Sequence, residues 1–519
     1  MPLRHEPPSL RKAAMTVIGE NFEPLCYGAS PEEVAAMIDN EEYLAVKGPF
    51  VDMPGPVLAG VAETISERRA LHRKHLHILV QPQLPRLNLS FGDADGFHGI
   101  MFVGQRCKNL KHLNLSYLRH INPNVLSSLL PSFTTIVTLN LRMTLTVDQL
   151  LAQIGRHCPV LRELNLFGTP ITDRGLVQLC ISAEGRRQCQ RLQKLVVADT
   201  CVSVSGAAVV LQSLPNLTDF DFDHIFEAAD LVEQWDRVLE ARLLTPAGVR
   251  LSEQPVAPPD LLQLRALTSN AEFVSMDWVD SAVKMCPFTT SVTISGSWLP
   301  SEVLYKFMVL ENLTALSLTN GEGLTLDFQE GVLPLLSACG ERLQNLILAS
   351  FTEIDIAGIG RTCPGLLNLA LSAIGHFDPI NSVNPAWFSR LNALEVWCDT
   401  SQAHAPVHEQ VVSPCLLRQL LVSRNIKNLL FTACGTLTDR LFAEIWRDNP
   451  MKKLSHLTLD HCHGVSPQLV HQVLDAENEL TMLRLWSCCQ IHKNHNAEFS
   501  KRICSENMNM YLEWFAYND

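Results

Sequence analysis

Residues 158–179 read CPVLRELNLFGTPITDRGLVQL, and this stretch decides the fold. Leu161, Leu164 and Leu166 follow the spacing L-x-x-L-x-L, with charged or polar residues at the alternate positions. Alternation of this kind is typical of a short strand that buries one face. A strand followed by a helix cannot cover that face alone, so the unit is expected to recur along the chain.

The same template does recur, at intervals in or near the roughly 20–29 residues of leucine-rich repeats. It begins at Leu84, Leu110, Ile136, Leu161, Leu192, Leu217, Leu313, Leu343, Leu366, Leu391, Ile426, Leu454 and Leu480. Weaker copies at Leu261 and Thr289 bridge the gap after Leu217, which gives about fifteen repeats. We therefore predict an α/β fold, a leucine-rich repeat solenoid with a curved parallel sheet inside and helices outside.

The template divides the chain into three segments. Residues 1–80 lack it and are expected to form a helical module that binds an adaptor or caps the first repeat. Residues 81–495 form the solenoid, and residues 496–519 a C-terminal cap.

Composition excludes several classes of protein. The 519 residues include 54 acidic and 41 basic side chains, a net charge of −13, which disfavours a nucleic-acid partner. No apolar stretch approaches the roughly 18 residues of a membrane span, and the start, MPLRHEPPSLRKAA, lacks the apolar segment of a signal peptide. Sixteen cysteines are too few for a disulfide scaffold of this length. We expect a cytoplasmic or nuclear protein without a membrane partner.

Half of the cysteines stand at two fixed places in the repeat. Five cysteines lie three positions before the first residue of the template: Cys107, Cys158, Cys189, Cys286 and Cys363. Three more lie three positions after its last residue: Cys434, Cys462 and Cys488. Cysteine buried at such a place acts as a small hydrophobe with a weak S–H donor, which favours a structural role.

These cysteines, with CPVLRELNLFGTPITDRGLVQL and ACGTLTDRLFAEI from Ala433, resemble the cysteine-containing leucine-rich repeats of the F-box/LRR family. The resemblance covers roughly residues 80–495. It is specific for the type of repeat and only moderately specific for function, because a fold does not determine an activity.

The segment SLRKAAMTVI, from Ser9 to Ile18, would place Leu10, Ala14 and Ile18 on one helical face, with Ser9 as the N-cap. It resembles the elongin-binding box, whose serine or threonine, leucine, small residue and aliphatic residue dock on elongin C. Alanine stands at residue 14, where that family usually has cysteine.

A second segment, MPGPVLAGVAETI from Met53, has the hydrophobic-proline start shared by F-boxes and by cullin-binding boxes, here Met53 and Pro54. Together the two segments resemble the N-terminal module of Zyg-type leucine-rich receptors of cullin ubiquitin ligases. That resemblance implies elongin C or a Skp-type adaptor, and a cullin, as partners. The tryptophan that normally ends an F-box is absent, and a plain helical cap on the first repeat explains the same residues.

The sequence offers no enzyme motif. It contains no phosphate-binding loop, no G-x-S-x-G and no H-E-x-x-H, and we expect neither catalysis nor a cofactor. Cysteine and histidine do cluster late in the chain, at His461, Cys462, His463, Cys488, Cys489, His492 and His495. Because Cys462 and Cys488 already occupy the framework position and no paired C-x-x-C spacing is present, we interpret the histidines as turn residues and expect no metal.

Template positions three, five and seven point away from the buried leucines and are expected to line the concave face, which suits a protein ligand. Position five is asparagine in four successive repeats, an amide column that can serve simply to stabilise the sheet. The residues we predict to bind protein are Asp219, Asp221, Asp223, Glu395, Trp397, Asp460, Arg484 and Trp486. The acidic trio would attract a basic segment, and the tryptophans are typical hot spots unless the terminal MYLEWFAYND covers them.

Two hypotheses follow. The chain is either the substrate-recognition subunit of a cullin ubiquitin ligase or a non-catalytic scaffold with the same solenoid and no link to ubiquitin.

Overall fold

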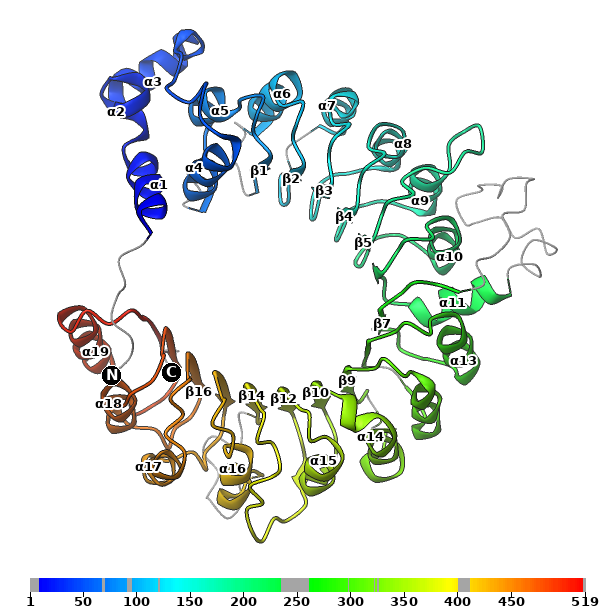
Figure 1. Cartoon of the computed structure of the whole chain (residues 1–519), viewed down its shortest axis with the longest axis vertical. Helices are drawn as coiled ribbons and strands as arrows, with labels where there is room; N and C mark the ends of the chain where they lie inside the picture. Colours follow the sequence, from blue (N-terminus) through cyan, green and yellow to red (C-terminus); the bar gives the residue numbers. More distant parts are fainter. Residues whose placement is uncertain are drawn as a thin grey trace. The chain divides into compact units, whose positions relative to one another are not determined.

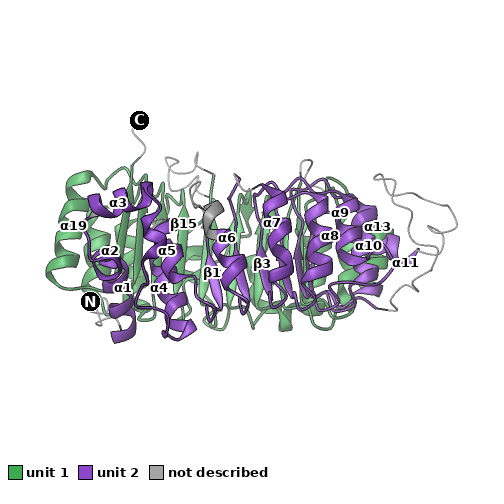
Figure 2. Ribbon diagram, turned by 90° about the horizontal axis from the view of Figure 1, so that it is seen from above, with its two compact units in different colours: residues 1–7, 269–283, 287–519 green, residues 8–268, 284–286 purple. Residues whose placement is uncertain are grey.

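The computed structural model describes residues 9–67, 71–90, 96–119, 122–234, 261–296, 298–321, 323, 326–399 and 411–516. The chain divides into two compact units (Figure 2). The N-terminal unit comprises the described residues up to 268 and residues 284–286, and the C-terminal unit comprises residues 269–283 and the described residues from 287 onward. In each unit a parallel sheet carries helices on one side (Figure 1).

The N-terminal unit begins with helices that precede its first strand. They are α1 (Leu10–Glu20), α2 (Phe22–Tyr27), α3 (Pro31–Asp39), the short η1 (Glu42–Ala45), α4 (Gly55–Glu67) and α5 (Arg73–Leu79). Phe22 of α2 is buried against Phe50 and His75, with ring centroids 5.8 and 4.8 Å away, so α2 is anchored on α5.

Strands and helices then alternate. Within the described residues the strands form a six-stranded sheet in chain order: β1 (Arg86–Asn88), β2 (His112–Asn114), β3 (Thr138–Asn140), β4 (Glu163–Asn165), β5 (Lys194–Val196) and β6 (Asp219–Asp221). The helices between and after them are α6 (Gly96–Arg106), α7 (Pro123–Leu129), η2 (Leu130–Ser132), α8 (Asp148–His157), α9 (Asp173–Cys180), α10 (Val204–Ser213) and α11 (Ile225–Glu233).

A second sheet, ten-stranded within the described residues, begins at the boundary of the units and continues through the C-terminal unit. Its strands are β7 (Ala266–Ser269), β8 (Ser291–Ser295), β9 (Ala315–Thr319), β10 (Asn345–Ala349), β12 (Asn368–Ser372), β14 (Ala393–Trp397), β15 (Asn428–Thr432), β16 (His456–Asp460), β17 (Met482–Trp486) and β18 (Tyr511–Phe515). The short β11 (Glu353–Ile354) and β13 (His376–Phe377) pair separately.

The helical segments that accompany this second sheet vary in type. They are α13 (Met276–Met285), the 3₁₀ helix η3 (Ser301–Val309), the π-helix η4 (Phe328–Val332), α14 (Leu333–Cys339), η5 (Gly340–Arg342), α15 (Ile356–Thr362), α16 (Pro414–Leu420), α17 (Asp439–Asp448), α18 (Pro467–Asp475) and α19 (Lys493–Ser505).

The strands pair in register, so equivalent template positions stack. Leu87 lies beside Leu113, and Leu113 beside Leu139, each buried on the helical side of the sheet. Burying a leucine side chain contributes about 1.5–3 kcal/mol, and this ladder is repeated along both sheets. The predicted leucine-rich repeat solenoid is therefore confirmed as the fold class.

Two repeats differ from the prediction. The copy placed at Leu261 begins three residues later, because Leu264 is buried and leads into β7, whereas Leu261 is exposed. The end of the chain supplies a further strand, β18, that pairs with β17. Its template was missed because Tyr511 and Leu512 follow Asn509 and not a leucine.

Buried or half-buried carboxylates connect neighbouring repeats. Asp173, at the start of α9, accepts hydrogen bonds at 2.7 Å from both the backbone N–H and the hydroxyl of Ser203, the N-cap of α10. Asp148 binds Thr172 in the same way at 2.8 and 2.6 Å. We call these contacts aspartate clamps; Asp439 of the C-terminal unit forms another, with Ser466.

All eight framework cysteines are buried, as their predicted structural role requires. Burial raises the pKa of Cys107, Cys158 and Cys286 to about 12, so their thiols stay protonated. The Cys107 thiol donates to the Gln81 carbonyl at 3.1 Å.

Candidate protein-binding surfaces

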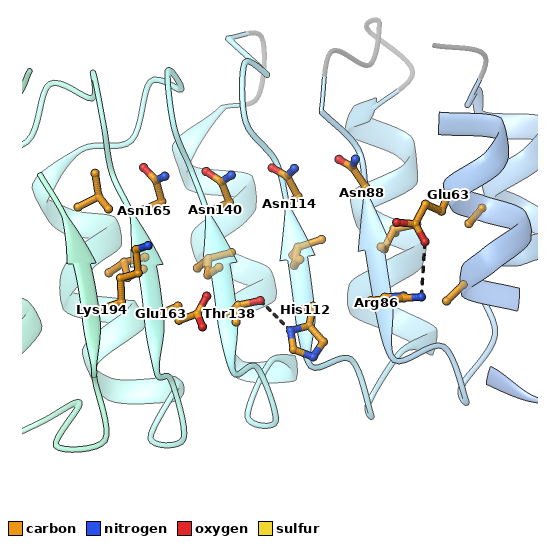
Figure 3. A pocket seen from close by; sticks show the side chains of 17 residues that line it. Glu63, Arg86, Asn88, His112, Asn114, Thr138, Asn140, Glu163, Asn165 and Lys194 are labelled. Atoms are coloured by element: carbon orange, nitrogen blue, oxygen red, sulfur yellow. Dashed lines mark hydrogen bonds and ion pairs between the residues drawn. The ribbon is translucent and has the colours of Figure 1, made fainter. Parts of the chain in front are cut away.

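The open face of the N-terminal sheet contains a polar pocket of about 390 Å³ (Figure 3). Strands β1 to β5 form its floor, and Ala59, Ala62 and Glu63 of α4 form one wall. The polar side chains on the floor are Arg86, Asn88, His112, Asn114, Thr138, Asn140, Glu163, Asn165 and Lys194.

The four asparagines of the floor share one conformation. In each, Oδ1 accepts the backbone N–H two residues further on at 3.0 Å, which closes the end of the strand. The oxygens therefore have the predicted structural role. Because Oδ1 is engaged, the Nδ2 group of each amide is the part left for a ligand, and Figure 3 shows these amides side by side in a row that runs across the strands.

A second row on the floor, at template position three, carries mixed charge. Arg86 lies 3.5 Å from Glu63, and His112 Nδ1 lies 2.9 Å from the hydroxyl of Thr138. Further along the sheet, Glu163 of β4 and Lys194 of β5 stand opposite each other in the strand register. The sequence reasoning selected none of these residues, although the template assigned position three to this face. The arrangement can hold an extended polar segment through hydrogen bonds and short-range charge pairs.

The acidic trio predicted on β6 lies beside this pocket. Asp219 and Asp221 are exposed, and Asp223 is half-buried in the turn that follows the strand. Partial burial and the nearby charge of Asp223 raise the pKa of Asp221 above its ordinary value, while Lys194 opposes that shift. Negative charge is therefore concentrated at this end of the sheet, and a cationic group would stabilise it.

On the C-terminal unit, Glu395 and Trp397 lie on the sheet face of β14. Trp397 is 41% exposed, and its Nε1 donates to Glu395 Oε2 at 3.4 Å. The described part of the terminal segment, up to residue 516, does not cover this tryptophan. It forms β18 at the edge of the sheet, beyond β17.

The three other predicted residues of this unit already have partners. Asp460 Oδ1 lies 2.7 Å from His461 Nδ1. Arg484 donates from Nε to Glu513 of β18 at 3.0 Å, and its guanidinium lies 5.6 Å from the centre of the half-buried Trp486 ring. A ligand would have to compete for these groups, so Trp397 offers more free surface than Trp486.

The predicted adaptor-binding segment forms α1, with Ser9 as its N-cap accepting from Lys12 N–H at 3.2 Å. Leu10 is 88% exposed, Ala14 is exposed, and Ile18 is half-buried. Val17, 55% exposed, lies on the same face as Leu10 and Ala14 and was not predicted.

Met53 and Pro54 lie where α4 begins. The carbonyl of Pro54 accepts from Val57 and Leu58, and the carbonyl of Met53 accepts from the Gln83 side chain at 3.1 Å. Pro54 therefore contributes to the start of the helix, whereas Met53 contacts the residue before the first repeat, and the Pro54 side chain remains exposed.

The cysteine and histidine cluster has ordinary structural contacts. His463 Nδ1 accepts from the backbone N–H of Cys489 at 3.3 Å, and His495 Nδ1 accepts from that of His492 at 3.2 Å. In the part of the chain that the structure describes, no three histidine, cysteine, aspartate or glutamate side chains meet in a metal-binding arrangement. No helix in that part combines the length and the apolar composition needed to cross a lipid bilayer.

No protein-family model and no curated protein sequence matches this chain. Among solved structures, the Rad7–Elc1 complex of yeast aligns with 94% of this chain and 96% of the matched chain, at 13% identity and a TM-score of 0.46. A leucine-rich repeat protein of Leptospira interrogans aligns with 85% of this chain and 92% of its own, at 13% identity and a TM-score of 0.35. An internalin of Listeria monocytogenes aligns with 82% of this chain and 96% of its own, at 13% identity and a TM-score of 0.34. At this level of similarity the comparisons leave the family unassigned.

Proposed function

We propose that this protein is a non-catalytic substrate-recognition subunit of a cullin-type ubiquitin ligase, with α1 docking on elongin C and the sheet faces binding a protein substrate. The observation that carries the proposal is the exposure of α1. None of its residues is buried, and Leu10, the residue that corresponds to the docking leucine of the elongin-binding box, is 88% exposed.

The opposite face of α1 is attached to α4. Met15 packs onto Gly60 of α4 so closely that a Cβ at residue 60 would lie 2.6 Å from the methionine sulfur. Arg11 also donates to the Pro56 carbonyl at 3.1 Å. The apolar face is thus held outward on a fixed base, which reduces the entropy that an adaptor must overcome on binding.

Capping of the first repeat is performed by other helices. Leu58 and Ile65 of α4 are buried, and the hydroxyl of Ser66 donates to the Asn88 carbonyl of β1 at 3.1 Å. Arg106 of α6 donates to the His77 carbonyl of α5 at 2.8 Å. Since α4 and α5 cover the repeat, a capping role does not account for the exposed face of α1.

The direct test is binding of the purified full chain to elongin C by calorimetry. A docked leucine contributes about 1.5–3 kcal/mol, so Leu10→Asp should weaken binding at least tenfold. Val51→Asp is the matched control, because Val51 is 55% exposed in the same module but outside α1. Ala14→Cys, which restores the residue usual in the elongin-binding box, should tighten binding.

If the wild-type chain binds neither elongin C nor a Skp-type adaptor, or if Leu10→Asp binds as the wild type does, the receptor proposal is wrong and the scaffold hypothesis replaces it. The substrate-binding part has its own test. Reversing the charge of Asp219, Asp221 and Asp223 to lysine should abolish capture of a basic substrate segment and leave elongin C binding unchanged.

A further inference from the structure

Three aromatic side chains gather after β7 and β8, two from the loops that follow these strands and one from the first turn of α13. Phe273 stacks on Trp298 at a centroid distance of 5.6 Å, and Trp278 meets Phe273 edge to face at 5.8 Å. Phe273 is 45% and Trp298 48% exposed, while Trp278 is half-buried. We call these three residues the aromatic cluster.

The backbone holds the aromatic cluster in place. Trp298 N–H donates to the Glu272 carbonyl at 2.7 Å, which makes a parallel bridge between the two loops. The residues directly after the two exposed rings, Val274 and Leu299, are buried. The rings are therefore presented by a fixed frame.

The repeat itself does not require aromatic residues here. The same bridge recurs between β11 and β13, where Glu353 pairs with His376 and the next residues, Ile354 and Phe377, are buried. In that bridge the two exposed positions carry a carboxylate and an imidazole. Large exposed rings at the equivalent positions expose apolar surface to water, and such clusters on folded proteins mark interaction sites.

Acidic residues are the direct sequence neighbours of two members of the aromatic cluster, Glu272 of Phe273 and Asp277 of Trp278. Glu272 and Asp277 are exposed, and among the described residues neither has an ion-pair partner. The nearby Asp280 is neutralised by Lys306 at 2.8 Å. Ring faces and unpaired carboxylates both attract cations, and the planar guanidinium of arginine can stack on a ring while it donates to a carboxylate.

We propose that the aromatic cluster, with Glu272 and Asp277, is a binding surface for an arginine-bearing segment of a protein partner. The surface is formed by two loops and the first turn of α13, outside template positions three, five and seven, so it is separate from the sheet face assigned to a substrate. It does not depend on a link to ubiquitin.

Fluorescence anisotropy of a labelled peptide of alternating glycine and arginine, titrated with the full chain in about 0.15 M salt, tests the proposal. Trp298→Ala should weaken binding about tenfold, because cation–π contact and ring burial are both lost. Phe288→Ala is the matched control, since Phe288 is 43% exposed in the same unit and belongs to neither the aromatic cluster nor the residues predicted to bind protein. It should leave the affinity within twofold of the wild type.

A second variant keeps the rings intact. Glu272→Gln with Asp277→Asn should weaken binding about threefold to tenfold and reduce its dependence on salt, with an unchanged circular dichroism spectrum. The lysine version of the peptide should bind more weakly than the arginine version. The proposal is overturned if the peptide does not bind, if both the Trp298 and the acidic variants bind as the wild type does, or if Phe288→Ala loses as much affinity as Trp298→Ala.

Discussion

The aspartate clamp between Asp173 and Ser203 allows a quantitative prediction about how the repeats hold together. Asp173 is 2% exposed and receives two hydrogen bonds at 2.7 Å. Bonds to a charged group contribute about 1.5–3 kcal/mol each, and their loss leaves the Ser203 donors without an acceptor. Asp173→Ala should therefore lower the free energy of opening around α9 and α10 by about 3 kcal/mol.

Hydrogen exchange followed by mass spectrometry measures this locally. Peptides that cover α9 and α10 should exchange about a hundredfold faster in Asp173→Ala, as a loss of about 3 kcal/mol implies. Asp173→Asn, which keeps one acceptor oxygen, should lower the free energy of opening by a smaller amount. Gly206→Ala should resemble Asp173→Ala, because a Cβ at residue 206 would lie 2.3 Å from the carboxylate.

Two controls define the test. Asp439→Ala removes the corresponding clamp of the C-terminal unit and should accelerate exchange only around α17 and α18. Asp277→Ala removes an exposed first-turn carboxylate that forms no clamp and should change exchange little. If Asp173→Ala exchanges within about threefold of the wild type, the clamp does not couple the repeats.

Three further predictions concern the amide column, a buried histidine and the thiols. Asn140→Ala should cost about 1 kcal/mol in urea unfolding because Arg142 N–H loses its acceptor, whereas Asn140→Asp, which keeps an acceptor oxygen, should cost less; equal losses would contradict the role of Oδ1. Burial and the charge of Lys74 lower the pKa of His75 from 6.5 to about 3. Below about pH 6.5 the unfolded chain therefore binds a proton on this imidazole that the folded chain does not bind. The free energy of unfolding should fall by about 2 kcal/mol from pH 7 to pH 5, and His75→Gln should reduce this dependence on pH. A thiol reagent should label the native chain rapidly only at its exposed cysteines, and rapid labelling of a framework cysteine would contradict their burial; the expected sites are Cys201, Cys489 and Cys504.

The repeat fold was predictable because the leucines that define it also form the core. Each template leucine in the N-terminal sheet is buried beside its equivalent in the next strand, so spacing in sequence becomes contact in space. The template failed where other residues fill those places. β18 lacks a leucine at its start, and the leucine run at Leu261 to Leu264 allowed two registers, of which only burial selects one.

The candidate sites were less accessible to sequence reasoning. Exposure of Leu10 could not be derived from periodicity, because an apolar helical face can equally pack inward; the contact of Met15 with Gly60 decides its direction. The aromatic cluster was missed because its residues lie in two loops and the start of α13, outside the template. Phe273 and Trp298 are 25 residues apart in the chain, close to one repeat length, and that interval is the signal that could have found them.

The thiols of the C-terminal repeats have a consequence for the lifetime of the protein. Cys398, Cys434, Cys462 and Cys488 belong to successive repeats, and Cys434 shares a hydrogen bond with Cys398. If these repeats open, the thiols lose the burial that keeps most of them protonated, and each reactive thiolate already has another thiol nearby. In a solution exposed to air, oxygen would oxidise pairs of these thiols to disulfides, and the disulfides would prevent the repeats from closing again. The time for which the purified protein stays folded in storage should therefore depend on the rate of opening, and a reductant should lengthen it.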